Sequence, residues 1–275
     1  MIRIFNYIDR PSPIHRLTGA SKFAVLILWS IAAMTTFCTP FLVALTVLGF
    51  ILFAVSRIRL KEVRAMLILT MAIMLLNNIL IYLFAPEQGV SIYGSRDVIA
   101  TIVGRYTITK QQLLYHANVI LKYTATIPLI LLFVATTNPS EFAASLNRLG
   151  VNYRIAYAVA LAMRYIPDTQ NEYHDISLSQ QARGVEMSKK EHLFKRIAAA
   201  ASIILPLILS GMDRIDVIAN AMELRGFGKN RKRTWYMGRK FAPADIFCII
   251  FGFMLVAFTT AYSVLNGSRF WNPFV

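Results

Sequence analysis

The chain has 275 residues, of which 56% are hydrophobic and only 16% charged, and its formal net charge is +15. The long uncharged runs in this composition exclude an ordinary soluble domain and predict an all-α protein that crosses a membrane several times. In a membrane protein a basic excess usually lies in cytoplasmic loops beside anionic lipid, so we expect the lipid bilayer as a partner and no nucleic acid.

Five apolar segments are candidate membrane-spanning helices. The first two are only fifteen residues long, and a Cys-Thr-Pro turn joins them into a predicted helical hairpin. They cross about 30 Å of hydrocarbon only if flanking residues such as Lys22 extend to the interface. Lys122 interrupts the fourth segment and is expected either to face a cavity or partner or to reach the membrane surface. The predicted spans are 23–37, 41–55, 65–85, 113–137 and 246–265, with a polar loop over 87–110.

Lysine and arginine divide unequally between the two sides that five crossings define. The segments on the side of the N-terminus carry 24 of them, and the other side, including Lys122, carries 5. Because positively charged loops stay in the cytoplasm, the N-terminus is predicted to be cytoplasmic and the C-terminus extracellular.

The chain is predicted to have three regions: an N-terminal membrane region over 1–137 with four spans, a cytoplasmic helical region over 138–242, and a last span with an extracellular tail over 243–275. The middle region starts with a short helix that begins near Pro139 and closes at Gly150. Two long helices follow, over 153–183 and roughly 190–225, with predicted kinks at Pro167 and Pro206.

Each long helix begins with an apolar part and continues as an amphipathic one. The apolar parts, 155–163 and 197–210, are short for a span, so we expect both helices to lie at the membrane face or under the spans. The alternative is that one or both cross the bilayer, which gives six or seven spans. In the second helix one stripe is apolar, and another is formed by Asp213, Asp216 and Glu223. These acids are expected mainly to face solvent, the alternatives being that they join the two long helices or contact a partner.

An Arg-Gly pair ends both long helices, at Arg183-Gly184 and, forty-two positions later, at Arg225-Gly226. The ordinary explanation is a pair of routine helix ends, because a cation favours the negative end of the helix dipole and glycine accepts the left-handed conformation there. The functional explanation is that the two guanidinium groups bind carboxylates or carbonyls in a partner's groove. The spacing of the two Arg-Gly pairs does not decide between these two explanations.

The sequence resembles the transmembrane T component of energy-coupling factor transporters, vitamin and metal importers of the ABC superfamily. The resemblance covers roughly 15–265 and is strongest in "NPSEFAASLNRLGVNYRIAYAVALAMRYIPDTQNEYHDISLSQQARG" (138–184) and "AMELRGFG" (221–228). The segment "HRLTGASK" is similar to the family's His-Arg-Leu-Asp-Pro-Arg-Thr-Lys but departs from it at Thr18-Gly19-Ala20, which weakens assignment to the subgroup that serves several substrates.

The resemblance implies a non-catalytic coupling subunit in a prokaryotic plasma membrane. The family's two Ala-Arg-Gly-like motifs, which bind two ABC-type ATPase subunits, fall on Ala182, Arg183 and Gly184 and on Leu224, Arg225 and Gly226. ATP would be bound by those subunits, and the motion would pass to a membrane-embedded substrate-binding S component. An apolar stripe would face that component, formed by Ile197, Ile204, Ile208, Met212 and Ile215. The cargo, a vitamin or a metal ion, is not encoded in this chain.

No catalytic, cofactor or metal motif accompanies these helices. The sequence has no phosphate-binding glycine loop of the Walker A type, and its four histidines form no His-Glu-x-x-His. A secondary transporter would bury paired ionisable groups near midspan and contain repeat-related broken helices, neither of which is seen. A conventional ABC permease also presents cytoplasmic helices to ATPases, but two long helices with twin Arg-Gly ends are not expected of it.

Overall fold

The computed structural model describes residues 12–103, 106–185, 193–230, 235, 239 and 241–273. It divides into two compact units. We call Met1–Asn138 with Arg239–Val275 the bundle unit, and Pro139–Gly238 the crossed-helix unit. In the described residues both units are built from α-helices, and one two-stranded hairpin is added to the bundle unit. The all-α membrane architecture predicted from composition is confirmed.

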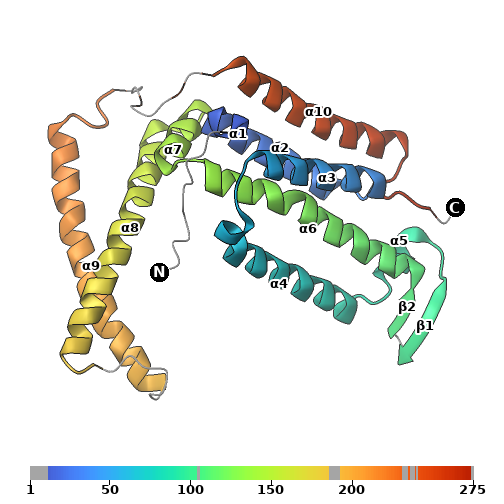
Figure 1. Cartoon of the computed structure of the whole chain (residues 1–275), viewed down its shortest axis with the longest axis horizontal. Helices are drawn as coiled ribbons and strands as arrows, with labels where there is room; N and C mark the ends of the chain where they lie inside the picture. Colours follow the sequence, from blue (N-terminus) through green and yellow to red (C-terminus); the bar gives the residue numbers. More distant parts are fainter. Residues whose placement is uncertain are drawn as a thin grey trace. The chain divides into compact units, whose positions relative to one another are not determined.

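The bundle unit is arranged around one central helix, α6 (Lys110–Thr136), which contacts most of the others (Figure 1). Around it lie α1 (Pro13–Arg16), α2 (Gly19–Thr35), α3 (Thr39–Val55), α4 (Leu60–Phe84), α5 (Gln88–Tyr93) and α10 (Pro243–Leu265). More than half of α6's most apolar stretch is buried within the protein, whereas α4 and α10 leave most of their apolar side chains exposed. Exposed apolar faces on the outer helices are what a lipid environment requires.

Helices α2, α3 and α6 form the core of this unit. Trp29 is fully buried, and its indole Nε1 donates a hydrogen bond to the carbonyl oxygen of Ala125, 3.0 Å away. Gly49 of α3 lets that helix approach α6 closely, since a Cβ there would lie 3.3 Å from the same carbonyl oxygen. Small residues at helix crossings permit this close packing in membranes, where van der Waals contact rather than the hydrophobic effect holds helices together.

Two lysines, Lys22 and Lys122, are buried between α2 and α6. Lys22 donates from Nζ to the carbonyl oxygen of Thr136 at the end of α6, at 2.9 Å. Lys122 donates to the carbonyl oxygen of Met34 in the last turn of α2, at 2.8 Å, and its Nζ lies 3.2 Å from the ring centroid of Phe37. The last carbonyls of a helix have no partner inside it and carry negative partial charge, so a buried ammonium group is stabilised there. Lys22 therefore holds the start of α2 against the end of α6, and Lys122 holds α6 against the end of α2.

The carboxylate of Asp245 joins the first turns of α10 and α2. It is fully buried, and its Oδ1 accepts hydrogen bonds from the Thr18 amide at 2.8 Å, the Thr18 hydroxyl at 3.1 Å and the Ser21 hydroxyl at 2.6 Å. Its Oδ2 accepts from the Ala242 amide at 2.8 Å. A negative charge at two helix N-termini is electrostatically favourable, and four donors offset the cost of burying it.

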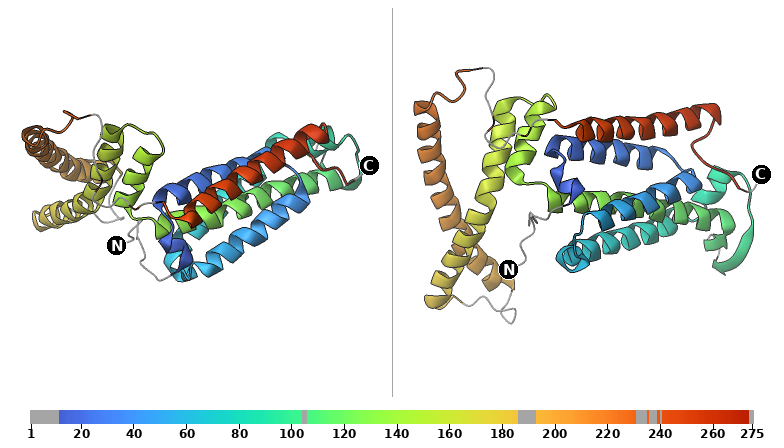
Figure 2. Two further views of the ribbon diagram at one scale, coloured as in Figure 1. Left: turned by 90° about the horizontal axis from the view of Figure 1, so that it is seen from above. Right: turned by 45° about the horizontal axis from the view of Figure 1, so that its top comes forward.

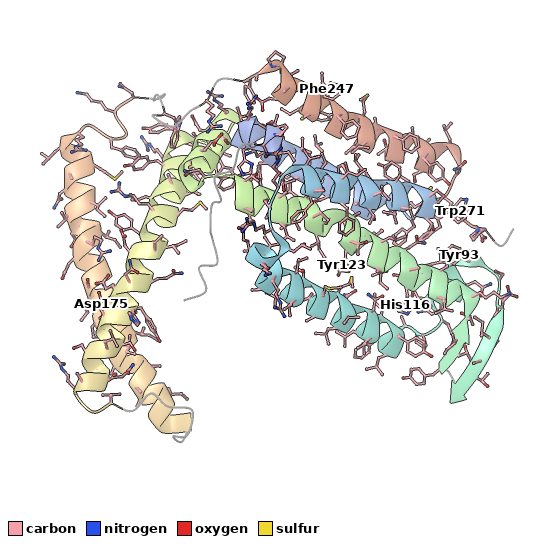
Figure 3. The ribbon with its side chains drawn as sticks, viewed as in Figure 1. Tyr93, His116, Tyr123, Asp175, Phe247 and Trp271 are labelled. Atoms are coloured by element: carbon pink, nitrogen blue, oxygen red, sulfur yellow. The ribbon has the colours of Figure 1, made fainter. Side chains whose placement is uncertain are left out.

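The segment 87–110, predicted as a polar loop, contains structure of its own. After α5, strands β1 (Val98–Val103) and β2 (Tyr106–Thr109) pair antiparallel and lead into α6. Gln112, almost fully buried, holds α5 in place by accepting a hydrogen bond from the Gly89 amide at 2.7 Å. Figure 3 shows Tyr93 and His116 at this same end of the unit, where His116 Nδ1 lies 3.0 Å from Asn78 Oδ1 of α4. Burial raises the pKa of the Tyr93 phenol.

Gly89→Ala is expected to destabilise this end of the bundle unit. A Cβ at Gly89 would lie 2.5 Å from the backbone oxygen of Gln111 and 2.6 Å from the backbone nitrogen of Gln112, so α5 would have to move and its bond to Gln112 would be lost. Such overpacking costs about 1–3 kcal/mol. Thermal unfolding of the purified protein in detergent measures the loss. The control is Gly211→Ala, also inside a helix but with no atom within 4 Å of the added methyl group; an equal effect of the two variants would refute the packing argument.

The crossed-helix unit consists of α7 (Pro139–Arg148), α8 (Tyr153–Ala182) and α9 (Leu193–Leu224). Helix α7 packs against α8, and α8 and α9 cross each other, as Figures 1 and 2 both show. Pro167 and Pro206 lie inside α8 and α9, which continue through them. Figure 1 shows α9 changing direction where it crosses α8. The predicted start of the second helix near Lys190 lies outside the described residues.

The apolar part of helix α9 is longer than the sequence analysis predicts. The sequence pattern predicts that 197–210 is too short for a span, but Ile197–Leu224 is long and apolar enough to cross a membrane by length and composition. Apolar residues continue beyond Ser210 on more than one side of the helix, among them Met212, Ile215 and Val217, and they extend the apolar segment. Within the described residues three other helices meet the same criteria, namely α4, α6 and α10, while α2 and α3 have 17 residues each and are about 25 Å long.

Candidate docking sites on the crossed-helix unit

The two Arg-Gly segments form the same helix-terminating structure. Gly184 and Gly226 both have positive φ, of 85° and 64°. At the end of α8 the Gly184 amide donates to the Gln181 carbonyl and the Val185 amide to the Gln180 carbonyl. At the end of α9 the equivalent residues, forty-two positions later, form the same two bonds. This is the Schellman arrangement, which satisfies carbonyls left without partners at a helix end. The glycines are therefore required by the backbone.

The arginine before each glycine is held at the surface by this arrangement. Arg183 and Arg225 are both exposed, and so are the preceding residues Ala182 and Leu224, the latter with 90% of its surface accessible. A leucine so fully exposed is unusual for a large apolar side chain. Each helix end thus presents a planar guanidinium group, which donates several hydrogen bonds in a fixed geometry, beside a small or apolar neighbour.

The structure does not bring the two arginines together. The segment after Arg225 lies at the beginning of α8, because the ring centroid of Phe227 is 4.8 Å from that of Tyr157 and Arg154 donates to the Gly228 carbonyl at 3.0 Å. Arg183 lies at the other end of α8, about 44 Å along a helix that rises 1.5 Å per residue. The two ends are therefore separate sites at opposite ends of the unit, and one small ligand cannot contact both.

Helices α8 and α9 are joined near their crossing by a polar cluster that the sequence analysis did not single out. Arg214 of α9 lies 2.7 Å from Oε2 of Glu172 of α8, and Ser210 donates to the other carboxylate oxygen. The Arg214 guanidinium also lies over the ring of Tyr165, 5.7 Å from its centroid. Glu172 and Arg214 belong to different helices, so the sequence offers no i, i+4 spacing that would have revealed the pair.

A groove of about 730 Å³ lies between the first half of α8 and the second half of α9. Its wall is mainly apolar and includes Leu161, Ile218, Met222 and Phe227, with Glu172 and Arg214 at one side. On the other side of the crossing the helices are in contact: Ile203 is fully buried, Ala199 nearly so, and the Gln180 amide group donates to the Ser202 carbonyl at 3.4 Å.

The predicted apolar stripe of α9 is exposed along its whole length. Its five residues have between 47% and 65% of their surfaces accessible. They are Ile197, Ile204, Ile208, Met212 and Ile215. The acidic residues Asp213, Asp216 and Glu223 are exposed as well, as expected for a solvated face. An exposed apolar stripe of this size indicates contact with lipid or with another protein.

Comparison with known proteins shows the family to which the chain belongs. The model of the CbiQ family, described as cobalt transport protein, matches residues 10–236. The chain belongs to the CbiQ family of cobalt transport proteins. The match includes α2 to α9 and both Arg-Gly ends. A multi-pass membrane location and a role as a transporter membrane component agree with the apolar helices of the bundle unit.

Similar curated proteins carry a consistent name. One from Leuconostoc gelidum subsp. gasicomitatum is 26% identical over 274 aligned residues, which cover 94% of this chain and 96% of that protein. One from Staphylococcus aureus is 23% identical, with 94% and 97% covered. A third, from Limosilactobacillus fermentum, is 34% identical over 83 residues, 30% of this chain and 31% of its own length. Each is named energy-coupling factor transporter transmembrane protein EcfT.

Proposed function

We propose that the chain is the non-catalytic coupling subunit of an energy-coupling factor importer. In this proposal two ABC-type ATPase subunits bind the Arg183 and Arg225 ends, and their ATP-driven motion is passed through α8 and α9 to a membrane-embedded S component that binds a vitamin or metal ion. The N-terminus is cytoplasmic, the C-terminus is extracellular, and ATP stays in the partner subunits.

The observation that carries this proposal is the pair of matching helix ends at opposite ends of the crossed-helix unit. Both expose an arginine before a left-handed glycine, and the two sites are too far apart for one small ligand. Two equivalent sites on one chain suit two equivalent partner subunits. Arginine suits both, because its planar group forms paired hydrogen bonds with carboxylates and carbonyl oxygens at a protein surface.

The exposed stripe of α9 is proposed as the face for the S component. An apolar partner helix packs against residues that recur every three or four positions on one helix face, which is the spacing of Ile204, Ile208, Met212 and Ile215. The acidic side chains on the same helix remain in solvent. The stripe and the arginine ends thus assign different partners to different parts of the unit.

Affinity purification from detergent, with mass spectrometry of the bound proteins, tests the assignment. We expect two nucleotide-binding subunits and one small hydrophobic membrane protein to be recovered with the chain. Replacing Ile204 and Ile208 by aspartate is expected to remove the small protein and to leave the ATPases bound, because the stripe is distinct from the helix ends. Recovery of the chain alone from its own membranes, or loss of all partners together in the stripe variant, would contradict the assignment.

A further inference from the structure

The residues at the contact between α8 and α9 are related by the same forty-two-residue shift that relates the two helix ends. A shift of forty-two positions superimposes Arg183-Gly184 on Arg225-Gly226, Ile166 on Ile208 and Ile176 on Ile218, and it also places Glu172 on Arg214. Glu172 and Arg214 are the two residues that form the ion pair at the crossing. When two equivalent helices cross about a local two-fold axis, the residue that contacts its own equivalent lies on that axis. The ion pair therefore marks the centre of the crossed pair.

The chemistry at this centre is stronger than that of an ordinary surface ion pair. The side chains of Arg214 and Glu172 are only 35% and 22% exposed, so water screens their attraction incompletely. Both carboxylate oxygens of Glu172 are used, one by Arg214 and the other by Ser210, one turn earlier on α9. The ring of Tyr165 supports the Arg214 guanidinium from α8. The cluster therefore fixes one point of α9 against one point of α8.

The two sides of this centre are not equivalent in packing, although the repeat makes them equivalent in sequence. On the side of Ile203 and Gln180 the helices touch, whereas the corresponding positions on the other side, Leu161 and Met222, line the groove. One side is already closed and the other has room. A rotation of α9 against α8 about the ion pair would change the separation of the two arginine ends.

We propose that Glu172, Ser210 and Arg214 form the pivot through which displacement of one arginine end is passed to the other. This inference rests on the proposed function, in which two ATPase subunits hold those ends. The three residues are positioning residues: they touch neither ATP nor cargo. Their part is to keep the crossing point fixed, so that the two helices turn about it rather than slide past each other.

The test measures the distance between the arginine ends in the complete transporter complex. Spin labels are attached at Leu178 and Asn220, which are equivalent in the repeat and exposed. Distances are recorded by pulsed electron paramagnetic resonance in lipid nanodiscs, with and without a non-hydrolysable ATP analogue. We expect the wild-type chain to show a narrow distribution that shifts when nucleotide binds. The variants Glu172→Gln and Arg214→Gln should each broaden the distribution and lose most of the shift.

Charge exchange separates a positioning role from general damage to the fold. The double variant Glu172→Arg with Arg214→Glu restores an ion pair at the same place and is expected to regain most of the shift, while Asp175→Asn, an exposed acid on α8 marked in Figure 3, should behave as wild type. If the ATPase subunits stay bound and both single variants keep the nucleotide-dependent shift in distance, the pivot is refuted and the proposed function is not. Failure of the ATPases to bind the wild-type chain would instead refute the proposed function.

Discussion

Reversal of both end charges, in the double variant Arg183→Glu with Arg225→Glu, is expected to detach the ATPase subunits and to abolish ATP-driven uptake while the protein remains inserted in the membrane. Neither arginine is buried, and the terminating glycines and their hydrogen bonds are unchanged by the substitutions. The fold should therefore survive. The loss would come from replacing a hydrogen-bond donor with a repulsive carboxylate inside a partner's groove.

The size of the effect depends on how many ends are changed. Removing one member of a desolvated charge pair at an interface costs about 2–5 kcal/mol, and 2 kcal/mol is roughly a thirtyfold loss of affinity. Because the two ends reach separate sites, binding at one raises the effective concentration at the other. Each single variant should therefore weaken recovery of the ATPases, and the double variant should eliminate it.

The matched control is Arg164→Glu, which makes the same charge change at an exposed position in the middle of α8. It should leave ATPase recovery unchanged, since the ends and not the net charge of the helix form the proposed contacts. Quantitative co-purification, with membrane insertion checked for each variant, measures the difference. Equal recovery of the ATPases with the double variant and with wild type would show that these arginines do not dock them.

Replacement of Asp245 by alanine should cause a large loss of stability in the bundle unit. Four donors, from Thr18, Ser21 and Ala242, would lose their acceptor, and those of Thr18 and Ser21 are buried. A buried donor without a partner costs about 1–3 kcal/mol, and a hydrogen bond to a charged group contributes about 1.5–3 kcal/mol. At roughly 2–4 °C per kcal/mol, the unfolding temperature should fall on the order of 10 °C.

Thermal unfolding in detergent, followed by size-exclusion chromatography after heating, measures this effect. Asp216→Ala on the exposed face of α9 is the control and should change the unfolding temperature little. Asp245→Asn should fall between the two, because an amide oxygen still accepts but its nitrogen adds donors to a site that already has four. An unfolding temperature for Asp245→Ala equal to that of the control would mean that the network does not stabilise the junction of α2 and α10.

The helices themselves were largely predictable from sequence, because apolar length and terminating residues depend on local chemistry. The five long apolar runs correspond to α2, α3, α4, α6 and α10 within a few residues. Gly150, Gly184 and Gly226 end the helices before them with positive φ, as their positions indicated. Pro139 is the first residue of α7. A proline or glycine constrains its own backbone, so its effect does not require knowledge of distant residues.

Contacts between distant residues were not predictable in the same way. Asp245 follows Pro243 as an acid in the first turn of a helix, which is a local signal, but its bonds to Thr18 and Ser21 depend on how α10 packs beside α2. The burial of Lys22 and Lys122 depends likewise on the antiparallel pairing of α2 and α6. The hairpin within 87–110 was not predicted, because its two strands are short.

At the candidate sites, sequence repetition predicted the ends but not the crossing. The Arg-Gly pairs stand out because identical letters recur, whereas Glu172 and Arg214 are opposite charges at equivalent positions and look unrelated until the helices are seen in contact. The apolar stripe of α9 followed from helical periodicity, and its exposure is consistent with a partner face without identifying the partner.

The most direct measurement of the central claim is site-specific photo-cross-linking at Ala182 and Leu224, the exposed residues that precede the two arginines. A photoreactive amino acid is introduced at each position in turn, native membranes are irradiated, and the cross-linked partner is identified by mass spectrometry. Both positions are predicted to link to a nucleotide-binding subunit, each to a separate copy. Cross-links from both positions only to lipid, or labelling of both by reagents confined to the outside of the cell, would contradict the account.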